Sequence, residues 1–213
     1  MLSQLDHLVV GTPDLEDGVA VIESLLGVPA TPGGSHPGIG TRNALFGLGE
    51  ECYLEVIGPD PAQTGFDGER PFGIDSLNTT RLVTWVARRA ELRSFAQALR
   101  VQEIILTEPM QFSRQAPDGE LLRWELAFLG GLEPGLMAVL PFFIDWGNTP
   151  NPAAKCSGGA RLGGLDVYHP KSTEVAAILT ALELNVESHQ SPVPGFRAII
   201  DGPNGKVELS TFL

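Results

Sequence analysis

Residues 5–10 read Leu5-Asp6-His7-Leu8-Val9-Val10, and this short apolar run with a β-branched pair at its end predicts a β-strand. Apolar residues then recur at three- and four-residue steps over 15–26, which predicts a helix with one buried face. We expect Thr12 to be its N-cap, with Pro13 at the first helical position. Gly27 is the expected end of this helix.

The segment after this helix predicts the rest of a compact unit. Residues 29–40 are rich in glycine and proline and lead into an apolar stretch over 43–48. Residues 49–51 predict a hairpin turn, and residues 52–57 a further strand. The order is therefore strand, helix and further strands, and we place this first unit at residues 1–60.

The same order recurs twice in the chain. The C-terminal part predicts a strand, a helix and three strands, with a Pro-Asn-Gly turn at 203–205, and we place this unit at residues 160–213. The middle part, residues 81–146, predicts a similar unit with a Pro-Asp-Gly turn at 117–119 and an additional strand over 138–144. Residues 147–159 are rich in Asn, Pro and Gly and predict a linker. Repetition at this unit size is typical of duplicated domains.

Composition limits the classes of partner. The chain has 213 residues, a net charge of −12 and a hydrophobic share of 43%, which is typical of a globular protein with a substantial core. A chain this acidic repels nucleic acid phosphates and anionic lipid. We find no basic leader and no long apolar run at the N-terminus, and only two cysteines, so we expect a cytoplasmic protein.

Five segments carry a resemblance to a known family. They are Leu5 to Val10, His36-Pro37-Gly38-Ile39-Gly40-Thr41-Arg42-Asn43, Tyr53-Leu54-Glu55-Val56-Ile57, Ser113-Arg114 with Pro117-Asp118-Gly119 and Trp124, and Pro141-Phe142-Phe143-Ile144-Asp145-Trp146. Together they resemble the glyoxalase-like domains of the vicinal oxygen chelate superfamily. The resemblance implies an α+β fold of repeated βαβββ units, whose curled mixed sheets form a cup with the helices outside.

The resemblance also implies a divalent metal site. In the family, a histidine on the first strand and a glutamate on the last strand of each unit bind the ion. His7 and Glu55 match these positions in the first unit, and Glu208 matches the glutamate of the last unit. Gly164 and Thr84 stand at the histidine positions of the other units. The glutamate position of the middle unit stays open between Arg123, Trp124 and Asp145, so the set of four ligands is incomplete.

Each candidate residue has a structural alternative. A histidine with carboxylates suits Mn, Fe, Ni or Zn, but His7 and Glu55 are equally explained as a strand histidine and its buried acceptor. His36, in a loop of small residues, is a candidate base or ligand, or an exposed loop histidine. Glu208 faces either a cavity or solvent, depending on which units pair.

Four further residues complete the predicted site. Arg114 beside Trp124 could hold a substrate carboxylate against an aromatic wall, and Asn43 and Asp145 are the other candidate substrate contacts. Two functions follow from these residues. The first is a metal-dependent lyase, isomerase or dioxygenase acting on a small oxygenated substrate. The second is a protein that sequesters a small molecule in the same cup. Independently of the function, the odd number of units predicts a homodimer, because one unit must pair with a unit of another chain.

Overall fold

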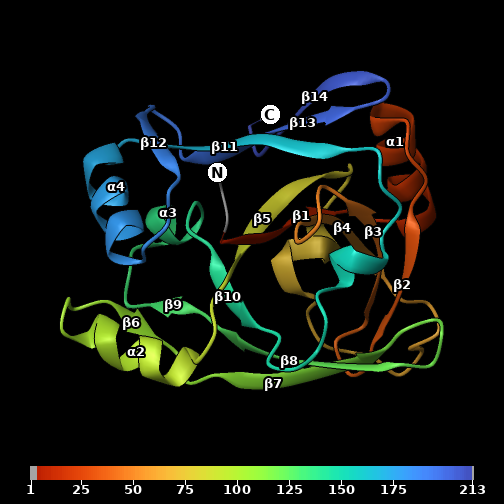
Figure 1. Cartoon of the computed structure of the whole chain (residues 1–213), viewed down its shortest axis with the longest axis horizontal. Helices are drawn as coiled ribbons and strands as arrows, with labels where there is room; N and C mark the ends of the chain where they lie inside the picture. The colour runs from red at the N-terminus through yellow and green to blue at the C-terminus, as the bar shows by residue number, and fades with distance from the viewer. Residues whose placement is uncertain (1–3, 213) are drawn as a thin grey trace.

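The computed structural model describes residues 4–212, and a curled eight-stranded sheet dominates it (Figure 1). Its strand order is β2-β3-β4-β1-β5-β10-β8-β7, and both parallel and antiparallel neighbours occur. The predicted α+β fold with a curled mixed sheet and a cup is confirmed. No helix among residues 4–212 is long and apolar enough to cross a membrane.

The first unit forms one half of this sheet. It consists of β1 (Leu5–Gly11), α1 (Leu15–Leu26), β2 (Thr31–His36), β3 (Thr41–Gly47) and β4 (Tyr53–Pro59). β4 lies parallel to β1, so the last strand of the unit is the neighbour of the first. A short 3-10 helix, η1 (Pro71–Ser76), leads to the second half.

The second unit repeats this order of strands. It contains β5 (Arg81–Arg88), α2 (Leu92–Arg100), β7 (Met110–Gln115), β8 (Leu121–Ala127) and β10 (Phe142–Asp145). Two short strands, β6 (Ile105–Leu106) and β9 (Leu129–Gly130), pair with each other outside the large sheet, and α3 (Pro134–Met137) precedes β10. β10 lies parallel to β5, as β4 does to β1. The strand that the sequence presents as additional is therefore the structural counterpart of β4.

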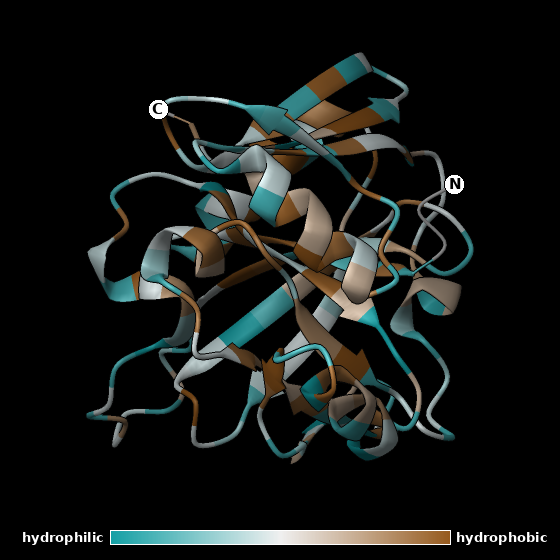
Figure 2. Cartoon of the chain, turned by 90° about the vertical axis from the view of Figure 1, so that its left-hand side faces the viewer, coloured by the Kyte–Doolittle hydropathy of each residue, from teal (hydrophilic) through white to brown (hydrophobic). Residues whose placement is uncertain are grey.

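The third unit has a sheet of its own and a different connection. After the 3-10 helix η2 (Pro152–Lys155) come β11 (Arg161–His169), α4 (Ser172–Ala181), β12 (Glu187–Gln190), β13 (Gly195–Gly202) and β14 (Gly205–Ser210). The strand order is β12-β11-β13-β14, so β14 pairs with β13 and not with the first strand of its unit. The strands at the top of Figure 2 show alternating hydrophobic and hydrophilic bands, as expected of a sheet with one buried face.

We call the four-stranded sheet of the third unit the third sheet. The main core lies between the large sheet, the third sheet and the helices. Leu8, Phe46 and Trp85 of the large sheet and Phe196 of β13 belong to one cluster of buried residues. Gly202 lets β13 approach α1 closely, because a Cβ atom there would lie 2.4 Å from the carbonyl oxygen of Leu26. The third sheet therefore covers the outer face of the large sheet. A second, smaller cluster of buried residues lies on the inner face, inside the cup.

Two local predictions need correction. The N-cap of α1 is Asp14, whose side chain accepts a hydrogen bond from the Asp17 N–H, while the Thr12 hydroxyl donates to the Asp14 carbonyl. The expected end at Gly27 is confirmed by its left-handed conformation. The Gly/Pro-rich stretch contains β2, because pairing with β3 supplies an extended partner that propensity alone does not predict.

Candidate functional site: a polar cluster inside the cup

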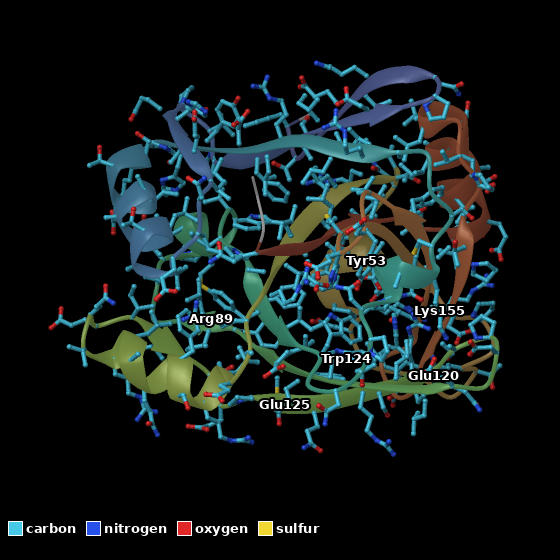
Figure 3. The ribbon with its side chains drawn as sticks, viewed as in Figure 1. Tyr53, Arg89, Glu120, Trp124, Glu125 and Lys155 are labelled. Carbon is cyan, nitrogen blue, oxygen red and sulfur yellow. The ribbon has the colours of Figure 1, made fainter. Side chains whose placement is uncertain are left out.

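The cup encloses a cavity of about 660 Å³, lined from both halves of the large sheet. The two edge strands, β2 and β7, come close together at Gly34, where a Cβ atom would lie 2.5 Å from the carbonyl oxygen of Gln115. Tyr53 and Trp124, labelled in Figure 3, line the cavity from β4 and β8 respectively. The close approach of these two edge strands therefore brings residues as far apart in the sequence as His7 and Trp146 to one cavity.

Glu55 is the centre of a buried polar cluster in this cavity. Nε2 of His7 lies 3.6 Å from Oε2 of Glu55, and Nε2 of His36 lies 3.9 Å from its Oε1. The Asn43 side-chain amide donates to Oε1 at 2.6 Å, and its own oxygen accepts the Gly34 N–H at 2.9 Å. His7, Asn43 and Glu55 are each less than 10% exposed. The structure thus brings four of the predicted site residues together.

Asp6 fixes the orientation of His7. A β-bulge at Asp6 inserts one extra residue in β1 opposite β5, between the pairs Leu5–Ala87 and His7–Val86. Nδ1 of His7 lies 2.7 Å from Oδ1 of Asp6. Because a carboxylate only accepts hydrogen bonds, Nδ1 donates to Asp6, and this contact turns Nε2 toward Glu55.

The Asp6 carboxylate has partners from three other parts of the chain. It accepts hydrogen bonds from Nε of Arg88 at 3.2 Å, Nε1 of Trp146 at 3.1 Å and Nδ2 of Asn151 at 2.8 Å. These donors compensate the cost of burying its charge completely. The sequence offered a signal for this role, because an aspartate within an apolar strand needs buried partners, but their identity depends on the tertiary fold.

Two further groups set the electrostatics around the histidines. Tyr53 stacks on the ring of His7 with a centroid distance of 4.5 Å, and burial, with the charges of Asp6 and Glu55, raises the pKa of the Tyr53 hydroxyl well above 10.0. Desolvation by burial lowers the pKa of His36 from 6.5, and Arg114 acts in the same direction against the opposing effect of Glu55. His36 is therefore neutral near pH 7, and its Nδ1 lies 2.9 Å from the Thr41 hydroxyl.

The second half of the cup has different chemistry at the equivalent positions. In the β1–β5 ladder His7 pairs with Val86, and Val9 pairs with Thr84. Exchanging the two halves maps the first pair onto the second, so Thr84 is the counterpart of His7 and Val86 is the counterpart of Val9. Val9 pairs with Glu55 on β4, whereas Val86 pairs with Phe142 on β10. The ladder therefore gives the second glutamate position to Phe142, and not to any of the three residues that the sequence left open.

The wall of the second half is mainly apolar. Phe142 stacks with Phe128 at a centroid distance of 5.1 Å and with Phe72 at 5.9 Å. The other large side chains of this wall are Trp124, Leu126, Ile144 and Trp146. Arg114 of β7 reaches the same cavity and is 5% exposed. Sequence reasoning identified Trp124 and Arg114 but missed Phe128, since the wall arises only when β8 and β10 pair.

Two predicted site residues lie elsewhere. Asp145 accepts hydrogen bonds from the Glu91 and Gly147 N–H groups, both at 2.8 Å, and is not among the residues that line the cup. Glu208 lies on β14, half exposed, with Oε2 3.5 Å from Nη1 of Arg197. Because β14 belongs to the third sheet, the fold does not bring Glu208 to His7 and Glu55.

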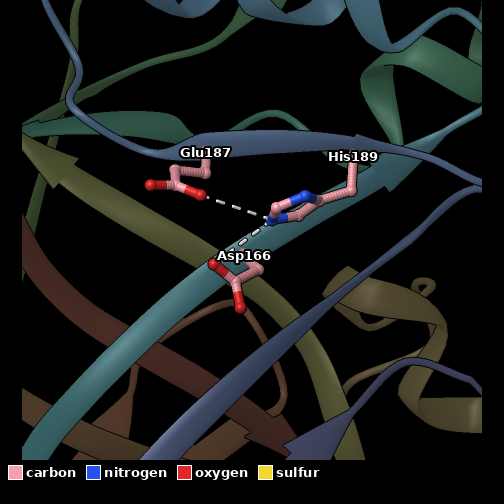
Figure 4. A group of neighbouring side chains, drawn as sticks. All are labelled: Asp166, Glu187 and His189. Carbon is pink, nitrogen blue, oxygen red and sulfur yellow. Dashed lines mark ion pairs between the residues drawn. The ribbon is translucent and has the colours of Figure 1, made fainter.

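A separate histidine–carboxylate group lies on the outer face of the third sheet (Figure 4). Nε2 of His189 is 3.6 Å from Asp166 and 3.7 Å from Glu187. The guanidinium of Arg197 lies 3.5 Å from Asp166 and hydrogen-bonds Tyr168. Since this fixed cation competes with a metal ion for Asp166, we interpret the group as an exposed ion-pair network.

Comparisons with known proteins agree with this architecture. A family model described as a glyoxalase-like domain matches residues 5–183. A crystal structure of a hypothetical protein from Staphylococcus aureus is 15% identical, with 97% of this chain and 84% of that chain covered and a TM-score of 0.66. Methylmalonyl-CoA epimerase from Mycobacterium tuberculosis is 18% identical, with 72% and 93% covered and a TM-score of 0.50. A comparison with curated proteins finds no match.

Proposed function

Because this chain belongs to the family of glyoxalase-like domains, we propose that it is an enzyme that holds a divalent metal ion in its cup and acts on a small oxygenated substrate. The observation that carries the proposal is the convergence of His7 and Glu55, forty-eight positions apart, on one buried point. The supporting detail is Asp6, whose contact with Nδ1 turns Nε2 of His7 toward that point.

The donor set fits such an ion. His7 and Glu55 each offer one donor atom, and these two atoms lie 3.6 Å apart. Imidazole and carboxylate donors without a thiolate suit Mn, Fe, Ni or Zn. When bound, the ion supplies Lewis-acid stabilisation of negative charge that develops on a substrate oxygen.

The protein's own residues supply orientation and a proton acceptor. Asn43 holds Glu55 by donating to Oε1, which leaves Oε2 directed at His7. His36 is neutral near pH 7, so its Nε2 can accept a proton from a substrate carbon or oxygen, while Thr41 holds Nδ1. The apolar wall excludes water from the other side of the substrate. Proton transfer of this kind favours a lyase or isomerase, with a dioxygenase as the other class.

A specific observation favours a second candidate, a binding protein without turnover. Thr84 and Phe142 occupy the positions that mirror His7 and Glu55, so the second half of the cup adds neither the histidine nor the glutamate. An ion held by one half only is bound less tightly, and the cavity of about 660 Å³ with its aromatic wall is suited to holding a small molecule by itself.

Elemental analysis of the purified protein separates the two functions. We expect stoichiometric metal in the wild-type protein and its loss in both His7→Ala and Glu55→Gln. The matched control is Glu208→Gln, which removes a carboxylate from the third sheet and should keep the metal. A wild-type protein without metal that still binds a small molecule, unchanged in both variants, would support the binding protein instead.

We also propose a cytoplasmic homodimer. The first two units join their strands in one sheet, whereas within residues 4–212 the third unit shares its sheet with no other unit. The outer face of this third sheet carries Asp166, Tyr168 and Arg197. Multi-angle light scattering tests this assembly, and a monomer across the accessible concentration range would contradict it.

A further inference from the structure

Arg114 is a buried cation built into the cavity wall. It lies on β7, at the edge of the large sheet, and is 5% exposed. Its side chain runs beside β2, where a Cβ atom at Gly34 would lie 3.2 Å from Nη1 and 3.6 Å from Cδ. The glycine therefore makes room for the guanidinium at the place where the sheet closes.

The charge of this group is not matched inside the protein. Nη1 of Arg114 is buried and has no hydrogen-bond partner within residues 4–212. A guanidinium is a permanent cation, and a buried charge without a partner is destabilising. Arg114 therefore adds a cation to the wall of the cavity, and its buried Nη1 is unpartnered within the described residues.

The cavity selects the kind of anion. Among the lining residues, Arg114 is the one permanent cation, and Glu55 and Glu69 are carboxylates. One positive charge near these carboxylates suits a single negative charge better than a doubly charged phosphate. The apolar wall of the same half, with Trp124, Phe128 and Phe142, suits an apolar or aromatic body.

We infer that the substrate is a small carboxylic acid with an apolar or aromatic body, whose carboxylate accepts a hydrogen bond from the guanidinium of Arg114. This inference deepens the proposed function, because it names the substrate class of the same site. The carboxylate lies at the β2–β7 edge, and the body lies against the aromatic wall. This arrangement leaves an oxygenated carbon of the substrate facing His7, His36 and Glu55.

Isothermal titration of metal-free protein with three probes tests the inference. The probes are 3-phenylpropanoate, its neutral isostere 3-phenylpropanamide, and phenyl phosphate. We expect the wild-type protein to prefer the carboxylate over the amide by about tenfold to a hundredfold, as for a hydrogen bond to a charged group. Arg114→Gln should lose this preference. Arg123→Gln, an exposed arginine on the neighbouring strand β8, is the matched control and should keep it.

Several outcomes would overturn the inference. They are equal affinity for acid and amide in the wild-type protein, tighter binding of phenyl phosphate, equal loss in Arg123→Gln, and no binding of 3-phenylpropanoate at millimolar concentration. Thermal denaturation checks that Arg114→Gln is folded; removal of an unpaired buried charge should not lower its midpoint. Because the titration uses metal-free protein, its result is independent of metal retention, so a failure of the proposed enzyme and a failure of this inference are distinguishable.

Discussion

The two halves of the large sheet share one strand order and differ in chemistry. β1, β3 and β4 present His7, Asn43 and Glu55 to the cavity, whereas β8 and β10 present Trp124 and Phe142, and Phe128 follows directly after β8. In the β1–β5 ladder the pair His7–Val86 mirrors the pair Thr84–Val9, so Thr84 mirrors His7 and Phe142 mirrors Glu55. The difference teaches that one repeat of this fold can carry the polar side chains while the other forms an apolar wall.

The largest effect on the polar half should come from Asp6→Asn. The amide cannot serve as a carboxylate acceptor for His7 Nδ1, Arg88 and Trp146 together, so His7 loses its fixed tautomer. We expect metal affinity to fall about 10- to 100-fold. Competition with a fluorescent chelator measures it.

The matched control for this change is Asp166→Asn, which removes a carboxylate from the exposed network of the third sheet. It should leave metal affinity unchanged. Equal affinity of Asp6→Asn and the wild-type protein would mean that the Asp6–His7 contact has a purely structural role.

The comparison can also be reversed by giving the apolar half the ligands of the polar half. The double variant Thr84→His with Phe142→Glu places imidazole and carboxylate at the mirrored positions. Since added ligand charge strengthens metal sites, we expect affinity to rise about tenfold. The same chelator competition measures it.

Phe142→Glu alone is the control for this double variant. Without a metal ion it buries a carboxylate, so it should lower the thermal midpoint, and added metal should restore it. No metal-dependent change in either variant would refute the equivalence of the two halves.

A smaller effect is expected from the aromatic wall. Phe128→Ala removes the ring that stacks on Phe142, which weakens the surface for an apolar ligand. We expect 3-phenylpropanoate to bind about three- to tenfold more weakly, with metal content unchanged. Titration calorimetry and elemental analysis on the same preparation test both parts; a loss of metal in this variant would argue against two separable halves.

The smallest effect concerns Asp60, which follows β4 and binds Ser35 near the end of β2, the strand that carries His36. Burial alone would raise the pKa of Asp60, but hydrogen bonds from Ser35, Gln63 and the Ala62 N–H lower it below 3.8. A carboxyl with a lowered pKa contributes stability above its ordinary pKa and loses that contribution as pH falls through its folded-state value.

We therefore expect Asp60→Asn to be less stable than the wild-type protein by about 1 kcal/mol at pH 7. The difference should shrink as pH falls below about 3.8. Urea denaturation from pH 3 to pH 7 measures it, and a difference that is constant across this range would show that the charge of Asp60 does not matter.

Local patterns in the sequence determined much of the fold. The apolar strand at 5–10, the helix that ends at Gly27 and the turn at 203–205 are short-range features, and each follows from side-chain periodicity or backbone preference. These patterns, with the family resemblance, also singled out His7, His36, Asn43, Glu55 and Arg114, all of which line one cavity. Such local patterns do not determine which strands pair with each other.

Only the tertiary structure decided which strands are neighbours. β4 lies beside β1, so Glu55 meets His7, but β14 lies beside β13, so Glu208 is separated from both. Asp145 likewise ends in contact with Glu91, outside the cup, and Asp6 gains donors from β5 and the segment after β10. The physical reason is that strand order depends on how whole sheets pack their apolar faces, a long-range property that no local spacing encodes.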